Sequence, residues 1–399
     1  MPDSNTDMPE KKMPIYLDYQ ATTPTDERVV AAMLPWFNEK FGNPHSSDHR
    51  HGWVSEEAVE RARGQVASII GAKPKEIIFT SGATESNNLS IKGVAHAADS
   101  SRRHIVTLAT EHKCVLQSCK RLEEEGFDLT ILGVRPDGLV DLDELAKSLT
   151  DKTLLVSVMA VNNEIGVIQP LAEIGALCRE RGIYLHTDAA QAVGKIPLDV
   201  NAMKIDLMSI TAHKFYGPKG VGALYIRRRP KVALRAEQDG GGQERGLRSG
   251  TVPTPLVVGF GEACAIAERE MPTEALRLAD LRDRILGRLR EALPTLHVHG
   301  DLDRRIPGNL NLSFANIDGQ DLMMRLDGLS VSTGSACSSA IVEPSHVLQA
   351  LDPDPALLHN SLRIGLGRYT TQEEIDRAAD DIVAAVSSLQ SASQVYEKA

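Results

Sequence analysis

The chain has 399 residues, of which 42% are hydrophobic and 25% are charged, and its formal net charge is −10. This is ordinary globular composition, and the length suits one large domain with a second, smaller one. The excess of negative charge argues against a general nucleic-acid surface or an anionic-membrane surface, and no run approaches the roughly 18 apolar residues of a membrane span.

Short apolar runs alternate with amphipathic runs from about Pro74 onward. The pattern predicts strands at 76–80, 104–110, 128–134, 153–160, 183–188, 206–210 and 222–228, and helices at 84–98, 113–126, 141–149 and 171–182. This alternation predicts an α/β fold, with a mostly parallel sheet covered by helices on both faces.

The pattern changes from about residue 266, where a long charged helix at about 268–293 is followed by fewer strands. We therefore expect a large domain over 14–265, whose first residues are free to pack with the smaller domain, and a smaller domain over 266–399. Residues 1–13 read as a disordered lead, because they lack the apolar segment of a secretory signal.

Polar residues follow the predicted strands where each strand ends. They are Thr84 in SGATES, His112, Asn162 and Asn163 in VNNEIG, Asp188 and Gln191, and Thr211, His213 and Lys214 in TAHKFYG. Because ligands of parallel sheets bind beyond the carboxyl ends of the strands, we expect these residues to converge. Each has a plain structural alternative: SGATES, for example, could be a capped helix start rather than a phosphate cradle.

Taken together, these residues are what pyridoxal phosphate requires. A lysine links the cofactor covalently, and a carboxylate pairs with the pyridine nitrogen so that the ring can accept electrons. A flat side chain stacks on the ring, while hydroxyl and amide groups hold the phosphate.

Long ordered motifs extend this reading over nearly the whole chain, from about Ile15 to about Ile382. They are YLDYQATTP, FGNPHS, FTSGATESNNL, TEHKCVL, VNNEIGVIQP, HTDAAQAVGK, HKFYGPKGVGALY, GGGQERGLRSGT, STGSACSSAIVEPSHVL and SLRIGLGRYTTQEEID. In these motifs the chain resembles the cysteine desulfurases of the housekeeping iron–sulfur-cluster-assembly type. These are class V aminotransferases of the fold-type-I pyridoxal-phosphate group, in which the large domain carries the cofactor and a smaller α+β C-terminal domain carries a mobile cysteine loop, here about 330–343.

The resemblance also implies residue roles, with pyridoxal 5'-phosphate as the cofactor and no metal. Lys214, His112 and Cys337 would be catalytic, with Lys214 binding the cofactor and Cys337 accepting sulfur. The cofactor would contact Asp188, Gln191, His112, Asn163, Thr84, Ala83, Thr211 and His213, and Thr251 would reach the phosphate of a second subunit in a homodimer. Arg363, with Asn163, would bind the substrate, because a guanidinium suits a carboxylate.

Cys337 lies among Gly and Ser residues, where a surface loop is expected and a packing role is not. The resemblance implies that L-cysteine becomes L-alanine, and that sulfur leaves as a persulfide on Cys337. The resemblance implies that this sulfur goes to a scaffold protein for iron–sulfur clusters, with tRNA thiolation as a further use. The family's scaffold-docking segment is not seen after SQVYEKA, which leaves scaffold delivery a weaker expectation than desulfuration.

The other four cysteines, Cys114, Cys119, Cys178 and Cys264, lie in helical patterns and are expected to pack. An odd total of five argues against a disulfide framework and favours a reducing compartment, the cytoplasm.

Other functions stay open. A selenocysteine lyase or direct cysteine lyase of the same fold would need no loop thiol, and a regulatory protein would keep the fold without turning over a substrate. The histidines of HSSDHRH could suggest a metal, but no supporting carboxylates surround them. Three positions differ from the form expected of the family. Ala212 replaces a glycine and would be strained if its φ were positive, Gln243 replaces a histidine, and Thr333 replaces a serine.

Overall fold

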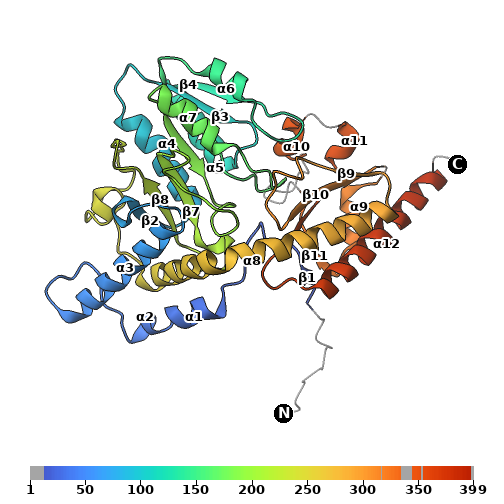
Figure 1. Ribbon diagram of the computed structural model, residues 1–399, viewed down its shortest axis with the longest axis horizontal. Coiled ribbons are helices and arrows are strands. Elements are labelled where there is room, and N and C mark those ends of the chain that lie inside the picture. The colour runs from blue at the N-terminus through green and yellow to red at the C-terminus, as the bar shows by residue number, and fades with distance from the viewer. Residues whose placement is uncertain (1–12, 316, 334–343, 352–353, 397–399) are drawn as a thin grey trace, which may run out of the picture.

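The computed structural model describes residues 13–315, 317–333, 344–351 and 354–396. Its centre is a seven-stranded sheet with the strand order β2-β8-β7-β6-β5-β3-β4 (Figure 1). The strands are β2 (Ile77–Thr80), β3 (His104–Leu108), β4 (Asp128–Leu132), β5 (Thr153–Ser157), β6 (Tyr184–Asp188), β7 (Leu207–Thr211) and β8 (Gly222–Ile226). β8 pairs antiparallel with β2 and β7, and the other neighbours are parallel.

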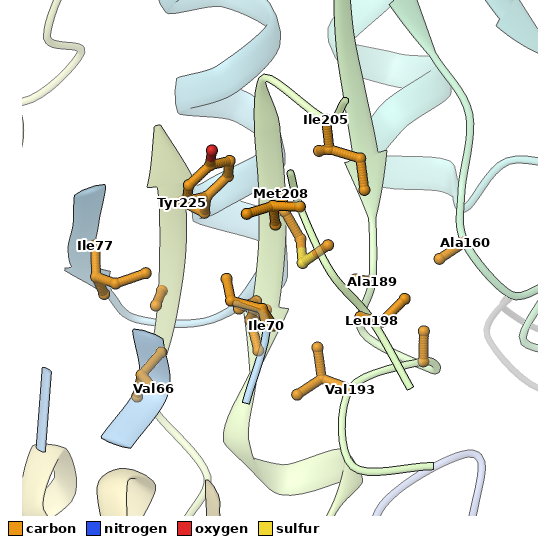
Figure 2. Packing of buried hydrophobic residues seen from close by; sticks show 14 of the residues in the cluster. Val66, Ile70, Ile77, Ala160, Ala189, Val193, Leu198, Ile205, Met208 and Tyr225 are labelled. Carbon is orange, nitrogen blue, oxygen red and sulfur yellow. The ribbon is translucent and has the colours of Figure 1, made fainter. Parts of the chain in front are cut away.

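Helices cover both faces of this sheet. The helices of this part of the chain are α1 (Glu27–Met33), α2 (Pro35–Asn38), α3 (Arg50–Ser68), α4 (Ala83–Ala97), α5 (Lys113–Glu124), α6 (Leu142–Ser148) and α7 (Leu171–Glu180), with short 3₁₀ helices at Pro74–Glu76, Ala212–Lys214 and Glu244–Gly246. Of these, α2 buries none of its residues. Successive residues of a strand point to opposite faces. Accordingly Ile77 joins the core under α3, whereas Ile78 joins the core under α4 and α5. Figure 2 shows part of the first core, where Val66 and Ile70 lie near Ile77 and Met208.

Helix α8 (Thr254–Ala292) links this layer to the C-terminal region (Figure 1). Its first half, including Phe260, belongs to the core of the large sheet, and its second half, including Ile285, belongs to a second core. A Cβ on Gly261 would lie 2.7 Å from Ala62 Cα, so this glycine permits the close approach of α8 and α3.

The C-terminal region is built on a three-stranded antiparallel sheet with the order β12-β10-β9. Its elements are β9 (Leu296–Val298), β10 (Asn309–Phe314), α9 (Gly319–Arg325), β11 (Leu329–Ser330), α10 (His346–Ala350), α11 (Pro355–Leu358), β12 (Ser361–Gly365) and α12 (Gln372–Tyr396). The N-terminal strand β1 (Ile15–Tyr16) pairs in parallel with β11, and Leu17 belongs to the second core.

The predicted strands and helices are confirmed, with ends that differ by a few residues. The long helix predicted from 268 instead begins at Thr254. Residues 1–12 of the predicted N-terminal lead lie outside the described residues. Ala212 does not have a positive φ, so the predicted strain is absent there. Among the described helices, none is both long and apolar enough to cross a membrane.

Candidate active site

Lys214 lies at the end of the turn that follows β7. Its Nζ donates hydrogen bonds to the backbone carbonyls of Gln20 at 2.6 Å and Ala21 at 2.7 Å. Gln191, in the turn after β6, donates through Nε2 to the same Gln20 carbonyl at 2.8 Å. Two residues predicted for one site therefore meet at one backbone oxygen.

Asp188 ends β6 and is buried. Its Oδ2 accepts a 2.6 Å hydrogen bond from Asn87 Nδ2 on α4, and its Oδ1 accepts one from the Ala190 amide at 2.9 Å. Because each oxygen accepts a hydrogen bond from a different donor, the orientation of the carboxylate is fixed. Asp188 can therefore pair with a cationic nitrogen at this edge.

His112 caps the start of α5, where its Nδ1 accepts the Cys114 amide at 3.2 Å. Burial lowers the pKa of His112, with the cation of Lys214 acting in the same direction and the carboxylate of Asp188 opposing it. These interactions place His112 within electrostatic reach of both groups. A half-buried neutral imidazole is suited to stacking on an aromatic ring.

Cys114 differs from the packing role predicted for it. Its Sγ lies 2.9 Å from His112 Nδ1 and 3.1 Å from Asn87 Nδ2, so it borders the site. Burial raises the pKa of its thiol to about 12, and a protonated thiol is a poor nucleophile. Cys119, Cys178 and Cys264 are buried, as predicted.

The predicted phosphate cradle lies where α4 begins. Gly82 precedes that helix with a φ of 153°, and a Cβ there would lie 3.6 Å from Thr211 Oγ1. Ala83 and the exposed Thr84 form the first turn, whose amides point out of the helix end. The structure thus brings this helix start to the end of β7.

His213 lies beside this cradle, and its Nδ1 is 3.1 Å from Thr22 Oγ1. Burial lowers its pKa to about 4, with nearby lysines acting in the same direction, so the ring is neutral at pH 7. Thr251 is exposed in the loop before α8. In that loop Gln243 Oε1 accepts the Gly250 amide at 2.9 Å.

Arg363 projects from β12 of the C-terminal sheet and is buried. Its Nη1 donates to the Asn163 carbonyl at 3.1 Å, and its Nη2 pairs with Asp18 Oδ1 at 2.7 Å. Its Nε is buried without a partner among the described residues. A guanidinium with an unused donor at a strand-end site is suited to binding a carboxylate.

Cys337 lies outside the described residues, but the chain on either side of it is described. The backbone of Ser332 pairs with Arg363, and Ser345 Oγ donates to Glu164 Oε2 at 2.5 Å. His346 Nε2 lies 3.0 Å from the Glu111 carbonyl, directly before His112. Both flanks of the cysteine segment are therefore attached to the site.

Sequence reasoning missed several of these contacts. Asn87, Asp18, Gln20 and Glu164 all lie in motifs that were singled out, but no role was assigned to them. Asn87 stands beside Asn88 with no sequence feature to separate them, and Gln20 contributes through its backbone oxygen. Among the described residues, no group of three or more His, Cys, Asp or Glu side chains forms a metal site.

The residues present fit pyridoxal phosphate. Gly82 has no side chain where α4 begins, and the Lys214 amine, the Asp188 carboxylate and the His112 ring come from the carboxyl ends of β7, β6 and β3, at one edge of the sheet. Lys214, Asp188, His112, Thr211 and the start of α4 would hold the group there.

Comparisons with known proteins agree with this geometry. The family model "Aminotransferase class-V" matches residues 15–378. A human protein named cysteine desulfurase is 57% identical over 384 residues, which cover 96% of this chain and 84% of the human protein. The cysteine desulfurase IscS of Rickettsia bellii is 53% identical over 393 residues, which cover 98% of this chain and 96% of the Rickettsia protein. A solved structure described as a NifS-like protein superposes with a TM-score of 0.88 at 39% identity, covering 94% of this chain and all of the other.

Proposed function

We propose that this chain, which belongs to the class V aminotransferase family, is a cysteine desulfurase that converts L-cysteine to L-alanine and passes the sulfur onward from Cys337. It is an enzyme, and its cofactor is pyridoxal 5'-phosphate. The observation that carries the proposal is the meeting of Lys214 and Gln191 at the Gln20 carbonyl, beside the fixed carboxylate of Asp188.

When bound, pyridoxal phosphate supplies an electron sink that permits cleavage at the substrate Cα and at its C–S bond. Lys214 holds the cofactor and moves the proton at the substrate Cα, as a general base and then as an acid. Arg363 binds the substrate carboxylate and so orients the sulfur. His112 would stack on the cofactor ring, and Asp188 would hold the ring nitrogen.

The sulfur then passes to Cys337. The Cys337 thiolate forms an S–S bond to the substrate sulfur as the Cβ–S bond of L-cysteine breaks. Cys337 becomes a persulfide, and the carbon skeleton takes up a proton at Cβ in place of the sulfur and leaves as alanine. The attachments of Ser332 and Ser345 to Arg363 and Glu164 support this role, because they hold both flanks of the cysteine segment beside the substrate-binding arginine.

The test compares wild type with Cys337→Ala and with the matched control Cys178→Ala, which removes a buried thiol from α7. Alanine and sulfide are measured from L-cysteine in the presence of a thiol reductant. We expect wild type and the control to make both products, and Cys337→Ala to bind cofactor but to make neither. Equal output from all three proteins would instead mean a direct lyase, without a persulfide on Cys337.

A second copy of the chain is the first partner we propose. Val30, Leu34, Phe37, Phe41 and Trp53 are all exposed on α1, α2, α3 and their connections, which we call the N-terminal apolar face. Large apolar side chains gathered on one side are typical of an interface. A homodimer covering this face would also allow the exposed Thr251 to serve a partner's phosphate site.

Sulfur acceptors are the second class of partner. We propose an iron–sulfur scaffold protein, and tRNA thiolation as a further outlet. The four free thiols among the described residues fit a reducing compartment, and we propose the cytoplasm. The division into domains at 14–265 and 266–399 is likewise proposed, supported by the two separate cores that share α8.

A further inference from the structure

Lys195 belongs to the HTDAAQAVGK motif but has no part in the roles described above. Its Nζ donates a 2.7 Å hydrogen bond to Gln191 Oε1. It lines a cavity of about 30 Å³, together with Gln20, Lys214 and Glu274. Lys195 therefore contacts the candidate active site through the side chain of Gln191.

This contact helps to determine which end of the Gln191 amide faces Lys214. A lysine ammonium has three donors and no acceptor, so the group that faces it must be the amide oxygen. The amide nitrogen then points the other way, and it donates to the Gln20 carbonyl at 2.8 Å. Lys214 Nζ bonds that same carbonyl at 2.6 Å. The two ends of the amide are nearly equal in shape, so its orientation depends on these two contacts: Lys195 at the oxygen end and the Gln20 carbonyl at the nitrogen end.

We propose that Lys195 is a positioning residue that fixes the Gln191 amide with its nitrogen toward Lys214, so that the site presents a hydrogen-bond donor there. This inference rests on the proposed function. The group that such a donor suits is the anionic ring oxygen of pyridoxal phosphate, beside the position where Lys214 binds the cofactor. A donor at this oxygen draws off negative charge and lowers the proton affinity of the bound cofactor.

The setting of Lys195 argues against a purely structural role. Burial lowers its pKa to about 7; the cations of Lys214 and Arg363 act in the same direction, and Glu274 opposes them. A site that penalises the charge of a lysine costs stability, and an apolar side chain of similar length would avoid that cost. The amine is retained, and it donates its hydrogen bond to Gln191 Oε1.

The test follows the visible absorption of the cofactor-loaded enzyme as a function of pH. We expect Lys195→Met to move the midpoint of the absorption change upward by about one pH unit, a tenfold change in proton affinity. Lys195→Arg, which keeps a donor and no acceptor, is expected to restore the wild-type midpoint. Gln191→Glu keeps an acceptor for Lys195 but loses the donor, and is expected to shift the midpoint upward as well.

A double variant separates positioning from direct electrostatics. In a Gln191→Met background, Lys195→Met is expected to cause no further shift, because the route through the amide is already lost. A full additional shift would show that the charge of Lys195 acts directly, and would overturn the inference. An unchanged midpoint in Lys195→Met would overturn it too. If Lys195→Met does not fold, Lys195→Leu, which also lacks a donor, replaces it with the same expectation.

The failure of this inference is distinguishable from that of the proposed function. If the wild-type protein binds no pyridoxal phosphate, it shows no visible absorption, and both fall together. If the wild-type protein binds it and all variants titrate alike, only the role of Lys195 falls.

Discussion

Asn87 Nδ2 donates a 2.6 Å hydrogen bond to Asp188 Oδ2, and both side chains are buried. The bond links α4, which also begins at the phosphate cradle, to the carboxylate at the end of β6. One helix therefore serves two parts of the site. Its amino end is suited to hold the phosphate, and its second turn fixes the carboxylate that would pair with the ring nitrogen.

Replacing Asn87 by Ala should weaken cofactor binding about tenfold to a hundredfold, because a hydrogen bond to a buried charged group contributes about 1.5–3 kcal/mol. Equilibrium dialysis of pyridoxal phosphate, read by visible absorption, measures the loss. Asn88→Ala is the matched control, since Asn88 Nδ2 donates only to the Thr84 carbonyl within the same helix. Equal losses in the two variants would contradict a specific role for Asn87.

The sequence alone predicts that several of the candidate site residues converge. The polar residues after the predicted strands converge because parallel strands end at one edge, and Lys214, Asp188 and Gln191 were predicted there. The start of α8 could not be predicted as readily. Its first turns, with Phe260, are buried by apolar neighbours, and the charged face that reveals a helix begins only near Glu268.

Contacts made through backbone atoms or between distant segments also escaped prediction. Lys214 bonds the carbonyls of Gln20 and Ala21, which any residue type could supply. Arg363 pairs with Asp18 across most of the chain length, and nothing local to either residue indicates the pair. The Arg363 contact arises where the segment at Asp18 lies beside β12, since Asp18 also bridges Gly365.

Arg363→Lys should raise the KM for L-cysteine at least about tenfold, because a point charge cannot bond Asp18, the Asn163 carbonyl and a carboxylate together. Steady-state alanine production measures KM and kcat separately, and the larger effect is expected in KM. Arg284→Lys is the control, since Arg284 forms a two-point contact with Asp376 on an exposed surface. A KM that stays at the wild-type value would exclude Arg363 from binding substrate.

Charged substitutions on the N-terminal apolar face should dissociate the proposed homodimer. Leu34→Glu/Phe37→Glu replaces two exposed side chains of this face, and we expect a monomer, because burying two carboxylates in an interface is costly. Sedimentation equilibrium measures the mass. The control is Met324→Glu on α9, where the side chain is also exposed. A double variant that remains a dimer would place the interface elsewhere.

The buried carboxyl of Glu164, which accepts Ser345 Oγ, should make stability depend on pH. Burial raises the pKa of Glu164 from its ordinary value of 4.5 to about 7, against the hydrogen bond from Ser345. Because the folded state holds this proton more tightly than the unfolded state, the contribution of Glu164 is fully present below pH 4.5. It is lost as the pH rises to about 7.

Glu164→Gln keeps an oxygen for Ser345 and removes the titration. Relative to this variant, the wild type should lose about 2–3 kcal/mol of unfolding free energy between pH 4.5 and pH 7.5. Urea unfolding at both pH values measures the difference, with the exposed Glu180→Gln as the control whose gap from wild type stays constant. If the Glu164→Gln gap is also constant, the carboxyl titrates alike in the folded and unfolded states, and burial does not raise its pKa. The attachment of Ser345 would then be a bond to a carboxylate at pH 7.5.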